Sequence, residues 1–233
     1  MPIVLTATVI PNGVKSAFGP QARLAEYIKV LKFYLQFAPV IFLENSGYPL
    51  EQHSEFSETS RLQVRRFKPS ANPGRGKGYQ EFEMLDAWLA AEPHPPARWL
   101  KISGRYQICN IERILNECQA AQGNALIIDQ LKHRVSARTY LFCVDTAFYQ
   151  QRLRGLYLQC DDDKGNWIEQ MLFLAMKDVP ATAVRLFKTQ PHLAATDGSS
   201  GTPFPSGRGQ WLFKQIFRSL NRLLDRKYLR YQK

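Results

Sequence analysis

Apolar runs and stretches of helical periodicity follow one another along most of the chain. Short runs rich in β-branched and apolar residues predict buried strands. Such runs predict strands at 3–10, 40–43, 62–67, 99–106, 125–129 and 139–144. Apolar residues spaced three or four positions apart predict helices. This spacing predicts helices at 21–37, 79–91, 110–122, 146–158 and 166–176.

The order of these elements favours an α/β fold. Strands that alternate with helices are typical of a mixed, mainly parallel sheet with helices on its faces, as in Rossmann-like domains. The length of 233 residues suits one such domain with an appendage. The sequence contains no run of ~18 consecutive apolar residues, so it does not predict a membrane-spanning helix. The first residues read as a strand and not as a leader, so we expect a cytoplasmic protein.

The last part of the chain has a different pattern. Residues 196–209 are rich in Gly, Ser and Pro, which predicts a flexible linker after a domain at 1–195. Residues 210–233 place apolar side chains at helical spacing, with basic residues every four positions on the other side. This pattern predicts a basic amphipathic helix, and such helices associate with membrane surfaces.

The charge distribution narrows the class of partner. The net charge is +11, and the segment from Arg208 to Lys233 holds eight basic residues and one acidic residue. We therefore expect no nucleic-acid partner, because a nucleic-acid-binding domain normally carries its basic patch on the folded body. An anionic membrane surface is the expected partner of residues 210–233. The alternative is that the apolar stripe packs on the domain and leaves the arginines in water.

Polar residues follow the first two predicted strands. Thr8 lies near the end of the first predicted strand and Pro11 directly follows it, and Glu44 and Asn45 come after the second. Open α/β sheets bind ligands at the carboxyl ends of their strands, so these residues are candidates for a nucleotide site. The alternative for Glu44 and Asn45 is a turn cap.

A glycine-rich loop precedes the helix predicted at 79–91. It contains Lys77 and Gly78 within the sequence Gly74-Arg75-Gly76-Lys77-Gly78. Glycines allow a ligand to approach the backbone closely, and the start of a helix favours an anion. The P-loop motif is absent, and the alternative is a mobile linker.

The strand predicted at 99–106 ends with two cations around a Ser-Gly pair. Lys101, Gly104 and Arg105 are therefore candidates for binding a phosphorylated ligand, since a guanidinium can hold a phosphate through two hydrogen bonds. The alternative is an edge strand protected by charge.

Two carboxylates are candidates for acid–base chemistry. Glu169 lies on the helix predicted at 166–176, where desolvation beside apolar residues would favour a general base. The alternative is an exposed helix glutamate. Asp145 ends the strand predicted at 139–144, with a helix N-cap as its alternative role. The four histidines have no metal-ligand spacing, and no hydrolase motif is present.

Taken in order, these segments resemble GT-A-type glycosyltransferases, especially bacterial enzymes that build surface polysaccharides such as lipopolysaccharide, O-antigen and capsule. The resemblance covers roughly residues 1–180. The segments that carry it are Leu5-Thr6-Ala7-Thr8-Val9-Ile10-Pro11, Phe42-Leu43-Glu44-Asn45-Ser46-Gly47, Gly76-Lys77-Gly78-Tyr79-Gln80-Glu81, Trp99-Leu100-Lys101-Ile102-Ser103-Gly104-Arg105-Tyr106 and Trp167-Ile168-Glu169.

The resemblance implies a GT-A-like sheet and a nucleotide-sugar donor carrying UDP, GDP or CMP. By this analogy Thr8, Pro11 and Glu44 face the nucleoside, beside Asn45. By the same analogy, Lys77, Lys101 and Arg105 face the diphosphate or the sugar. Gly78 and Gly104 lie beside them. Glu169 is the implied catalytic base, and Asp145 is the second catalytic candidate.

The chain departs from the family at one motif. GT-A enzymes usually carry Asp-x-Asp after the fourth strand, where this chain has Ser103-Gly104-Arg105. We therefore expect no divalent metal and no permanently bound cofactor, with Lys101, Arg105 and either Arg134 or Arg138 neutralising the leaving diphosphate. The resemblance also implies a lipid-linked glycan acceptor and a peripheral position at the inner face of the cell membrane. A nucleic-acid-binding protein and a non-catalytic membrane adaptor are the alternatives.

Overall fold

The computed structural model describes residues 1–13, 16–121, 123–129, 131–132, 135–177, 179–180, 182–196, 201–202, 207 and 209–219. Arg134, most of the predicted linker and the predicted helix beyond residue 219 lie outside these ranges.

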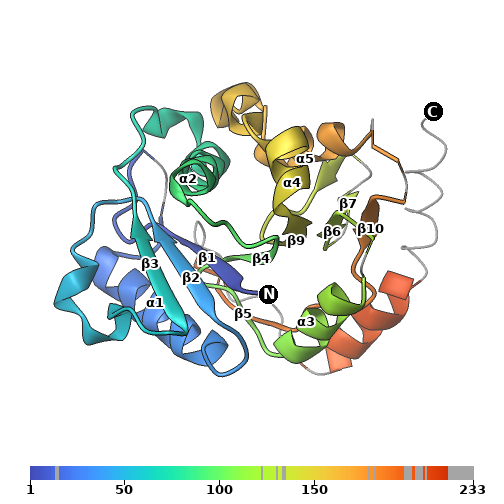
Figure 1. Ribbon diagram of the computed structural model, residues 1–233, viewed down its shortest axis with the longest axis horizontal. Helices are drawn as coiled ribbons and strands as arrows, with labels where there is room; N and C mark the ends of the chain where they lie inside the picture. The colour runs from blue at the N-terminus through green and yellow to red at the C-terminus, as the bar shows by residue number, and fades with distance from the viewer. Residues whose placement is uncertain are drawn as a thin grey trace.

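Seven strands form one sheet at the centre of the molecule, in the order β10-β6-β9-β4-β1-β2-β3 (Figure 1). Their bounds are β1 Ile3–Ala7, β2 Val40–Glu44, β3 Leu62–Arg66, β4 Arg98–Ser103, β6 Leu126–Ile128, β9 Leu141–Asp145 and β10 Val184–Leu186. Two small antiparallel pairs lie outside it: β5 Gln107–Ile108 with β11 Leu193–Ala194, and β7 Leu131–Lys132 with β8 Ser136–Ala137.

Six of these strands run the same way and β9 runs against them. β1 pairs in parallel with β2 and β4, β2 with β3, and β6 with β10, whereas β9 is antiparallel to both of its neighbours. The expected mixed, mainly parallel α/β sheet is thus confirmed. The reversal of β9 has a consequence for the site, because it sends the end of β9 to the edge of the sheet opposite the ends of β1 and β4.

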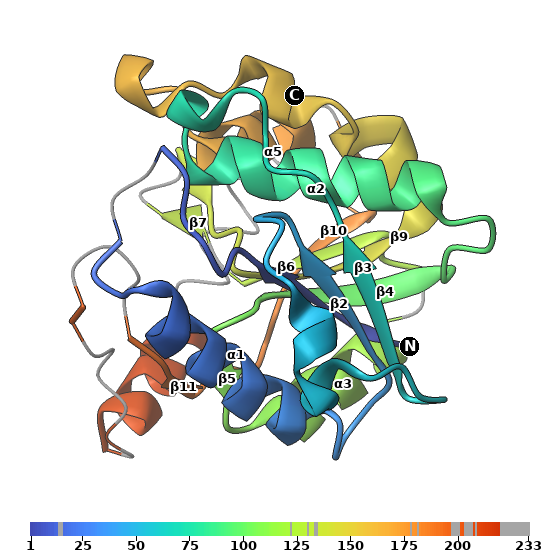
Figure 2. The same cartoon turned by 90° about the vertical axis from the view of Figure 1, so that its left-hand side faces the viewer.

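Helices cover both faces of the sheet. α1 (Pro20–Tyr34) and α3 (Ile111–Ala120) lie on one face, and α2 (Lys77–Ala91), α4 (Thr146–Phe148) and α5 (Ile168–Lys177) lie on the other (Figures 1 and 2). A π-helical turn at Tyr149–Leu153 and short 3₁₀ turns complete the connections. The bounds of these turns are Leu50–Gln52, Ser54–Phe56, Pro73–Arg75, Leu156–Gln159 and Asp162–Lys164.

Each face of the sheet has its own apolar core, because successive strand residues point to opposite faces. On β1, Ile3 and Leu5 pack in the core beneath α1 and α3, whereas Val4 packs beneath α2 and α5. All five residues of β1 are buried. A central strand covered on both faces must be apolar throughout, which is why the first run of the sequence lacks alternation.

Several predicted elements are longer than the observed ones. The first strand ends at Ala7 and β4 ends at Ser103, because the residues after them form the loops that carry the site. The helix expected at 146–158 is divided into α4, a π turn and a 3₁₀ turn. The short strands β5, β7, β8, β10 and β11 were not predicted, since two or three residues carry too little periodicity.

Residues 209–219 are helical, and this helix contacts the segment 187–190 that follows β10. Trp211 packs on the domain beside His192, but the other large apolar side chains of the helix do not: Phe213 and Ile216 are 62% and 64% exposed. Arg218 is instead buried against the domain. Among the described residues, no helix combines the length and the apolar character that crossing a bilayer requires.

Candidate active site

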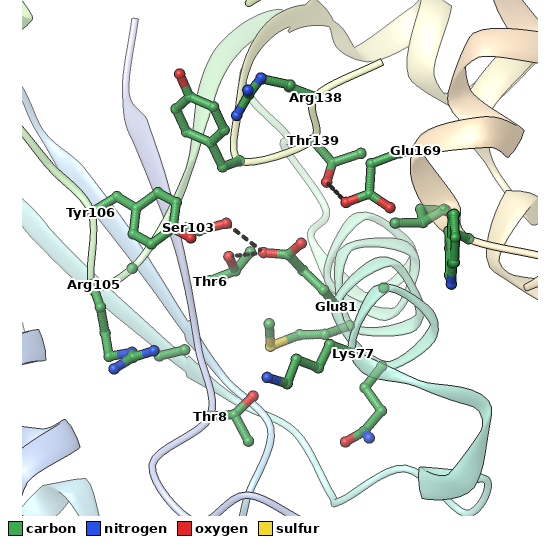
Figure 3. Close-up of a pocket in the computed structure, with 18 of the residues that line it drawn as sticks. Thr6, Thr8, Lys77, Glu81, Ser103, Arg105, Tyr106, Arg138, Thr139 and Glu169 are labelled. Carbon is green, nitrogen blue, oxygen red and sulfur yellow. Dashed lines mark hydrogen bonds between the residues drawn. The ribbon is translucent and has the colours of Figure 1, made fainter. Parts of the chain in front are cut away.

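A cavity of about 790 Å³ opens at the carboxyl ends of β1 and β4, between α2 and α5 (Figure 3). Ligands of open α/β sheets bind at this edge, where the connections from a central strand leave in opposite directions. The volume lies in the range of small-molecule sites, which is about 300–1,000 Å³. The site residues predicted from the sequence that line it are Thr8, Pro11, Lys77, Gly78, Gly104, Arg105 and Glu169.

Two glycines allow the start of α2 to form one wall of the cavity. A Cβ at Gly76 would lie 2.0 Å from Oδ2 of Asp162, and a Cβ at Gly78 would lie 2.3 Å from Cγ2 of Ile168. Gly76 also has a φ of 107°, which side chains of L-residues rarely adopt. The first turn of α2 therefore lies against the start of α5, and the carboxylate of Asp162 accepts a hydrogen bond from the Lys77 N–H at this helix start.

Gly104 has a comparable role at the end of β4. Its N–H donates to the carbonyl oxygen of Thr6 at 2.8 Å, and a Cβ at this position would lie 2.6 Å from that oxygen and 3.0 Å from the Tyr27 ring. The turn after β4 therefore stays close to β1. Gly104 lines the cavity through its backbone. The Ser103-Gly104-Arg105 motif has a glycine here because a side chain would prevent the close approach of the backbone to Thr6.

The floor of the cavity is a network around Glu81, a residue of α2. Oε1 of Glu81 accepts hydrogen bonds from Thr6 Oγ1 at 2.5 Å and Ser103 Oγ at 3.2 Å, and pairs with Lys101 Nζ at 2.6 Å. Lys101 also donates to the Thr139 carbonyl oxygen at 2.8 Å and has no exposed surface. The expectation that Lys101 contacts a diphosphate is therefore wrong. Lys101 does not line the cavity, because it is buried beneath the cavity surface, where its charge is neutralised by Glu81.

Glu169 projects from α5 into the same cavity, opposite Glu81 (Figure 3). Burial raises its pKa above the ordinary glutamate value, and the nearby charge of Glu81 adds to this rise. A hydrogen bond of 3.1 Å from Thr139 Oγ1 and the charge of Lys101 act in the opposite direction. The partly desolvated carboxylate has the properties that a general base requires.

Cationic side chains line the rest of the opening. Lys77 comes from α2, and Arg138 precedes β9 (Figure 3). The buried Nε atom of Arg138 has no hydrogen-bond partner among the described residues. Arg105 pairs with Glu26 at 2.7 Å and lies over the Phe18 ring. An anion in the cavity would therefore lie beside the side chains of Lys77, Arg105 and Arg138.

Glu44 and Asn45 support the site from behind and do not line it. Glu44 is fully buried, and its Oε1 accepts hydrogen bonds from the N–H groups of Val9 at 3.1 Å and Ser46 at 2.9 Å. Burial raises its pKa. Asn45 Oδ1 accepts from Thr8 Oγ1 at 2.6 Å. The expected contact of Glu44 with a nucleoside is corrected here: its carboxylate joins the loops after β1 and β2.

Asp145 lies at the other edge of the sheet. It ends β9, where it pairs with Arg98, the first residue of β4, at 2.9 Å. The sequence pattern does not indicate the direction of this strand. Because β9 is antiparallel, its carboxyl end is far from the carboxyl end of β4, and Asp145 is not part of the cavity.

Several residues of the site were missed by the sequence reasoning. These are Thr6, Tyr27, Glu81, Met84, Ser103, Tyr106, Thr139, Tyr140, Trp167 and Gln170. For Glu81 a signal was available, because it lies one turn into the helix after the glycine loop, on the side of Lys77 and Gly78. For Thr139 and Tyr140 no local pattern exists, since only the tertiary structure brings the segment before β9 to the cavity.

In the part of the chain that the structure describes, no group of three or more His, Cys, Asp or Glu side chains has an arrangement that could hold a metal ion. Glu81 and Glu169 are the carboxylates that line the cavity. The position of the usual metal motif is occupied by Ser103, Gly104 and Arg105, of which Ser103 donates to Glu81.

No protein-family model matches the chain, and no curated protein matches it. Solved structures do match. The glycosyltransferase GlyE of Streptococcus pneumoniae TIGR4 aligns with a TM-score of 0.53 and 10% identity, over 80% of this chain and 44% of that chain. Mouse xyloside xylosyltransferase 1 in its apo form has a TM-score of 0.47 and 10% identity, over 80% and 85% of the two chains. Rv0371c of Mycobacterium tuberculosis H37Rv has a TM-score of 0.49 and 9% identity, over 93% and 95%.

The match to the pneumococcal structure defines the class of fold. The chain spans less than half of the length of that enzyme, and at 10% identity the likeness concerns the fold alone. Its mixed seven-stranded sheet between helices is GT-A-like. The expected fold class is therefore confirmed, while the chemistry must be argued from this chain's own residues.

Proposed function

We propose that this protein is a glycosyltransferase that moves a sugar from a nucleotide-sugar donor to a hydroxyl group of a glycan. The observation that carries the proposal is the cavity itself: the start of α2 and the Lys77 side chain border one wall, and the partly desolvated Glu169 lines the same cavity from the adjoining start of α5 (Figure 3). The Lys77 side chain at the start of α2 favours the binding of a diphosphate. Glu169 favours the deprotonation of a reacting hydroxyl group.

The proposed mechanism uses Glu169 as the general base. An acceptor hydroxyl gives its proton to Glu169 as its oxygen forms a bond to the anomeric carbon, while the bond from that carbon to the diphosphate oxygen breaks. The negative charge on the leaving phosphate group is stabilised by the cations Lys77 and Arg138, which line the cavity. Glu81 is held by Lys101 and two hydroxyl groups, and its free oxygen suits a hydrogen bond to the transferred sugar.

The proposal includes a donor with UDP or GDP, which leaves as a diphosphate, or with CMP, which leaves as a monophosphate, and a reaction without a divalent metal. The cations of this chain support the metal-independent reaction, because Lys77 and Arg138 line the cavity in which the phosphate groups of the donor are proposed to bind. Around Thr8 the cavity is lined by Arg23 and Tyr27, which bond to the carbonyl oxygen and the N–H of Thr8, so the proposal names no single donor base.

We further propose a lipid-linked glycan as the acceptor, in bacterial surface polysaccharide synthesis at the inner face of the cell membrane. Support comes from the charge of the last segment, with eight basic residues and one acidic residue from Arg208 onward. A transferase that acts on lipid-linked sugars needs a reversible membrane attachment, and a basic amphipathic segment supplies one.

The experiment is thermal unfolding with UDP, GDP and CMP, first in EDTA and then with Mn²⁺. A ligand at ~100 times its dissociation constant adds about 2.7 kcal/mol of stability. At about 2–4 °C per kcal/mol, this gives a readily measured rise in melting temperature. We expect one nucleotide to raise the melting temperature in EDTA, and the Lys77→Met variant to lose most of that rise.

The result is then tested by turnover. The nucleotide sugar with the matching base should be consumed by the protein, and Glu169→Gln should not consume it. If the rise requires Mn²⁺, the metal-independent reaction is contradicted. Release of pyrophosphate from a nucleoside triphosphate, without use of a nucleotide sugar, would contradict the transferase itself.

A further inference from the structure

The 209–219 helix exposes a continuous apolar face. Leu212 is 55% exposed, Phe213 62%, Ile216 64% and Phe217 47%. Residues that are four positions apart lie on the same side of a helix, so Leu212 and Ile216 form one row and Phe213 and Phe217 the next. The rings of the two phenylalanines are 4.5 Å apart. Four large apolar side chains in water, side by side, are unusual for a surface helix and indicate a contact surface.

The opposite side of this helix is held to the domain by polar contacts. Trp211 Nε1 donates to the Gln190 carbonyl oxygen at 2.8 Å, and Gln215 Nε2 donates to the Lys188 carbonyl oxygen at 3.0 Å. The helix is thus docked in the reverse of the usual orientation, with its polar side inward. Since its buried polar groups have partners, the orientation is stable although the apolar side chains remain in water.

Arg218 is the main anchor of the helix. It is 5% exposed, pairs with the buried carboxylate of Asp129, and donates from Nε to the Phe187 carbonyl oxygen at 3.1 Å. Asp129 and Phe187 directly follow β6 and β10, which are parallel to β4. The helix is therefore anchored at the same edge of the sheet as the cavity. Asp129 also accepts from the hydroxyl of Tyr140 at 2.6 Å, and Tyr140 lines the cavity.

Charge decides which occupant this apolar face fits. Residues 220–233 hold five basic residues and one acidic residue, and the helix itself adds the exposed Lys214, whereas the charge of Arg218 is neutralised by Asp129. Two copies of the chain meeting through this face would bring two such basic segments together and repel. An anionic lipid surface has the complementary charge and accepts large apolar side chains at its interface.

We infer that Leu212, Phe213, Ile216 and Phe217 form the membrane-contact surface of this protein, and that they insert into the interface of an anionic bilayer. The Arg218 anchor then holds the cavity edge of the sheet beside that bilayer. This inference deepens the proposed membrane location by naming the residues and the orientation, and it requires no catalysis for its test.

The test is co-sedimentation of the full chain with lipid vesicles. Vesicles of phosphatidylglycerol mixed with phosphatidylcholine should bind the protein, and phosphatidylcholine alone should bind it much less. The variant Phe213→Ser/Ile216→Ser should lose roughly tenfold or more of its partition coefficient, because apolar insertion contributes beside charge. The matched control is Leu158→Ser/Leu174→Ser, which removes apolar side chains that are 58% and 48% exposed elsewhere. It should bind as the unaltered chain does.

Two results would overturn the inference. One is equal vesicle binding by the Phe213→Ser/Ile216→Ser variant and the unaltered chain. The other is a dimer in light scattering that the same double substitution converts to a monomer, which would assign the face to a second copy. The nucleotide-induced rise in melting temperature of these variants is measured in parallel. Vesicle binding without any such rise would contradict the transferase proposal and leave the membrane surface standing.

Discussion

Strand β4 carries an ion pair near each of its ends, and the two pairs differ in what surrounds them. At its start, Arg98 pairs with Asp145 at 2.9 Å, with the Asp145 side chain 37% exposed. Toward its end, Lys101 pairs with Glu81 at 2.6 Å, and the Lys101 side chain has no exposed surface. Both pairs join a cation of β4 to a carboxylate from another element.

The difference lies in the direction of the neighbouring chain. The Arg98–Asp145 pair lies at the amino end of β4, where the antiparallel β9 finishes. The Lys101–Glu81 pair lies beneath the loops that follow β1 and β4, where the cavity opens. A carboxylate that follows the carboxyl end of a strand is therefore a candidate for the ligand site only when that strand runs parallel to the central strands β1 and β4. Five substitutions test this comparison.

The largest effect is expected for Glu169→Gln on the cavity side. Loss of a general base lowers turnover by about 10²- to 10⁴-fold. The nucleotide-induced rise in melting temperature should remain, because Glu169 faces the reacting hydroxyl and not the diphosphate. Since burial raises the pKa of Glu169, turnover of the unaltered chain should rise with pH through a value above the ordinary glutamate range. An unchanged turnover rate in Glu169→Gln would remove this residue from the mechanism.

The next effect is expected for Lys101→Met, measured by urea unfolding. Removing one partner of a buried pair leaves the other charge uncompensated, which costs about 3–5 kcal/mol, and the partial exposure of Glu81 favours the lower value. The double variant Lys101→Met/Glu81→Gln should recover much of this loss. Strictly additive effects of the two substitutions would show that the pair is not coupled.

Gly104→Ala should destabilise the protein by about 1–3 kcal/mol, because the added Cβ would lie 2.6 Å from the Thr6 carbonyl oxygen and force the backbone to shift. The matched control is Gly74→Ala, since a Cβ at Gly74 meets nothing within 4 Å. Urea unfolding measures both. Equal stability of the two variants would mean that the turn after β4 has room to move away from β1.

A smaller, pH-dependent effect is expected for Glu44→Gln. Burial raises the pKa of Glu44 in the folded protein, so the folded state holds this proton more tightly than the unfolded state does. Its contribution to the free energy of unfolding is full below pH ~4.5 and is lost as the pH rises through the folded pKa. The variant should therefore lose less stability than the unaltered chain between acidic and neutral pH. Parallel pH profiles of unfolding would contradict a raised pKa.

The smallest effect is expected for Asp145→Asn at the other end of β4. The pair with Arg98 is partly exposed, so the free energy of unfolding should fall by less than about 1 kcal/mol. Turnover should stay within about twofold, because Asp145 lies at the edge opposite the cavity. A large loss of turnover with unchanged stability would return Asp145 to the candidate catalytic residues.

Much of the fold follows from periodicity. The apolar runs that became β1, β2, β3, β4, β6 and β9 are each long enough to be recognised, and the helices α1, α2, α3 and α5 show their apolar spacing. The fold class was predicted correctly on that basis. Strand direction was not, because a strand buried on both faces has the same composition whether it runs parallel or antiparallel to its neighbours. The position assigned to Asp145 depended on that direction.

Within the site, the sequence alone determined those residues that lie directly after a strand or at the start of a helix. Thr8, Lys77, Gly104 and Glu169 line the cavity for this local reason. Only the tertiary structure decided that Lys101 is neutralised by Glu81 and that Glu44 is turned inward. Lys101 and Glu81 are 20 positions apart, and Glu44 and the Val9 N–H that it accepts from are 35 positions apart. Whether such residues meet depends on how the chain folds and buries them, which no local pattern of the sequence indicates. The 209–219 helix follows the same rule: its amphipathic pattern is visible in the sequence, but the side that faces the domain was decided by the partners available to Arg218.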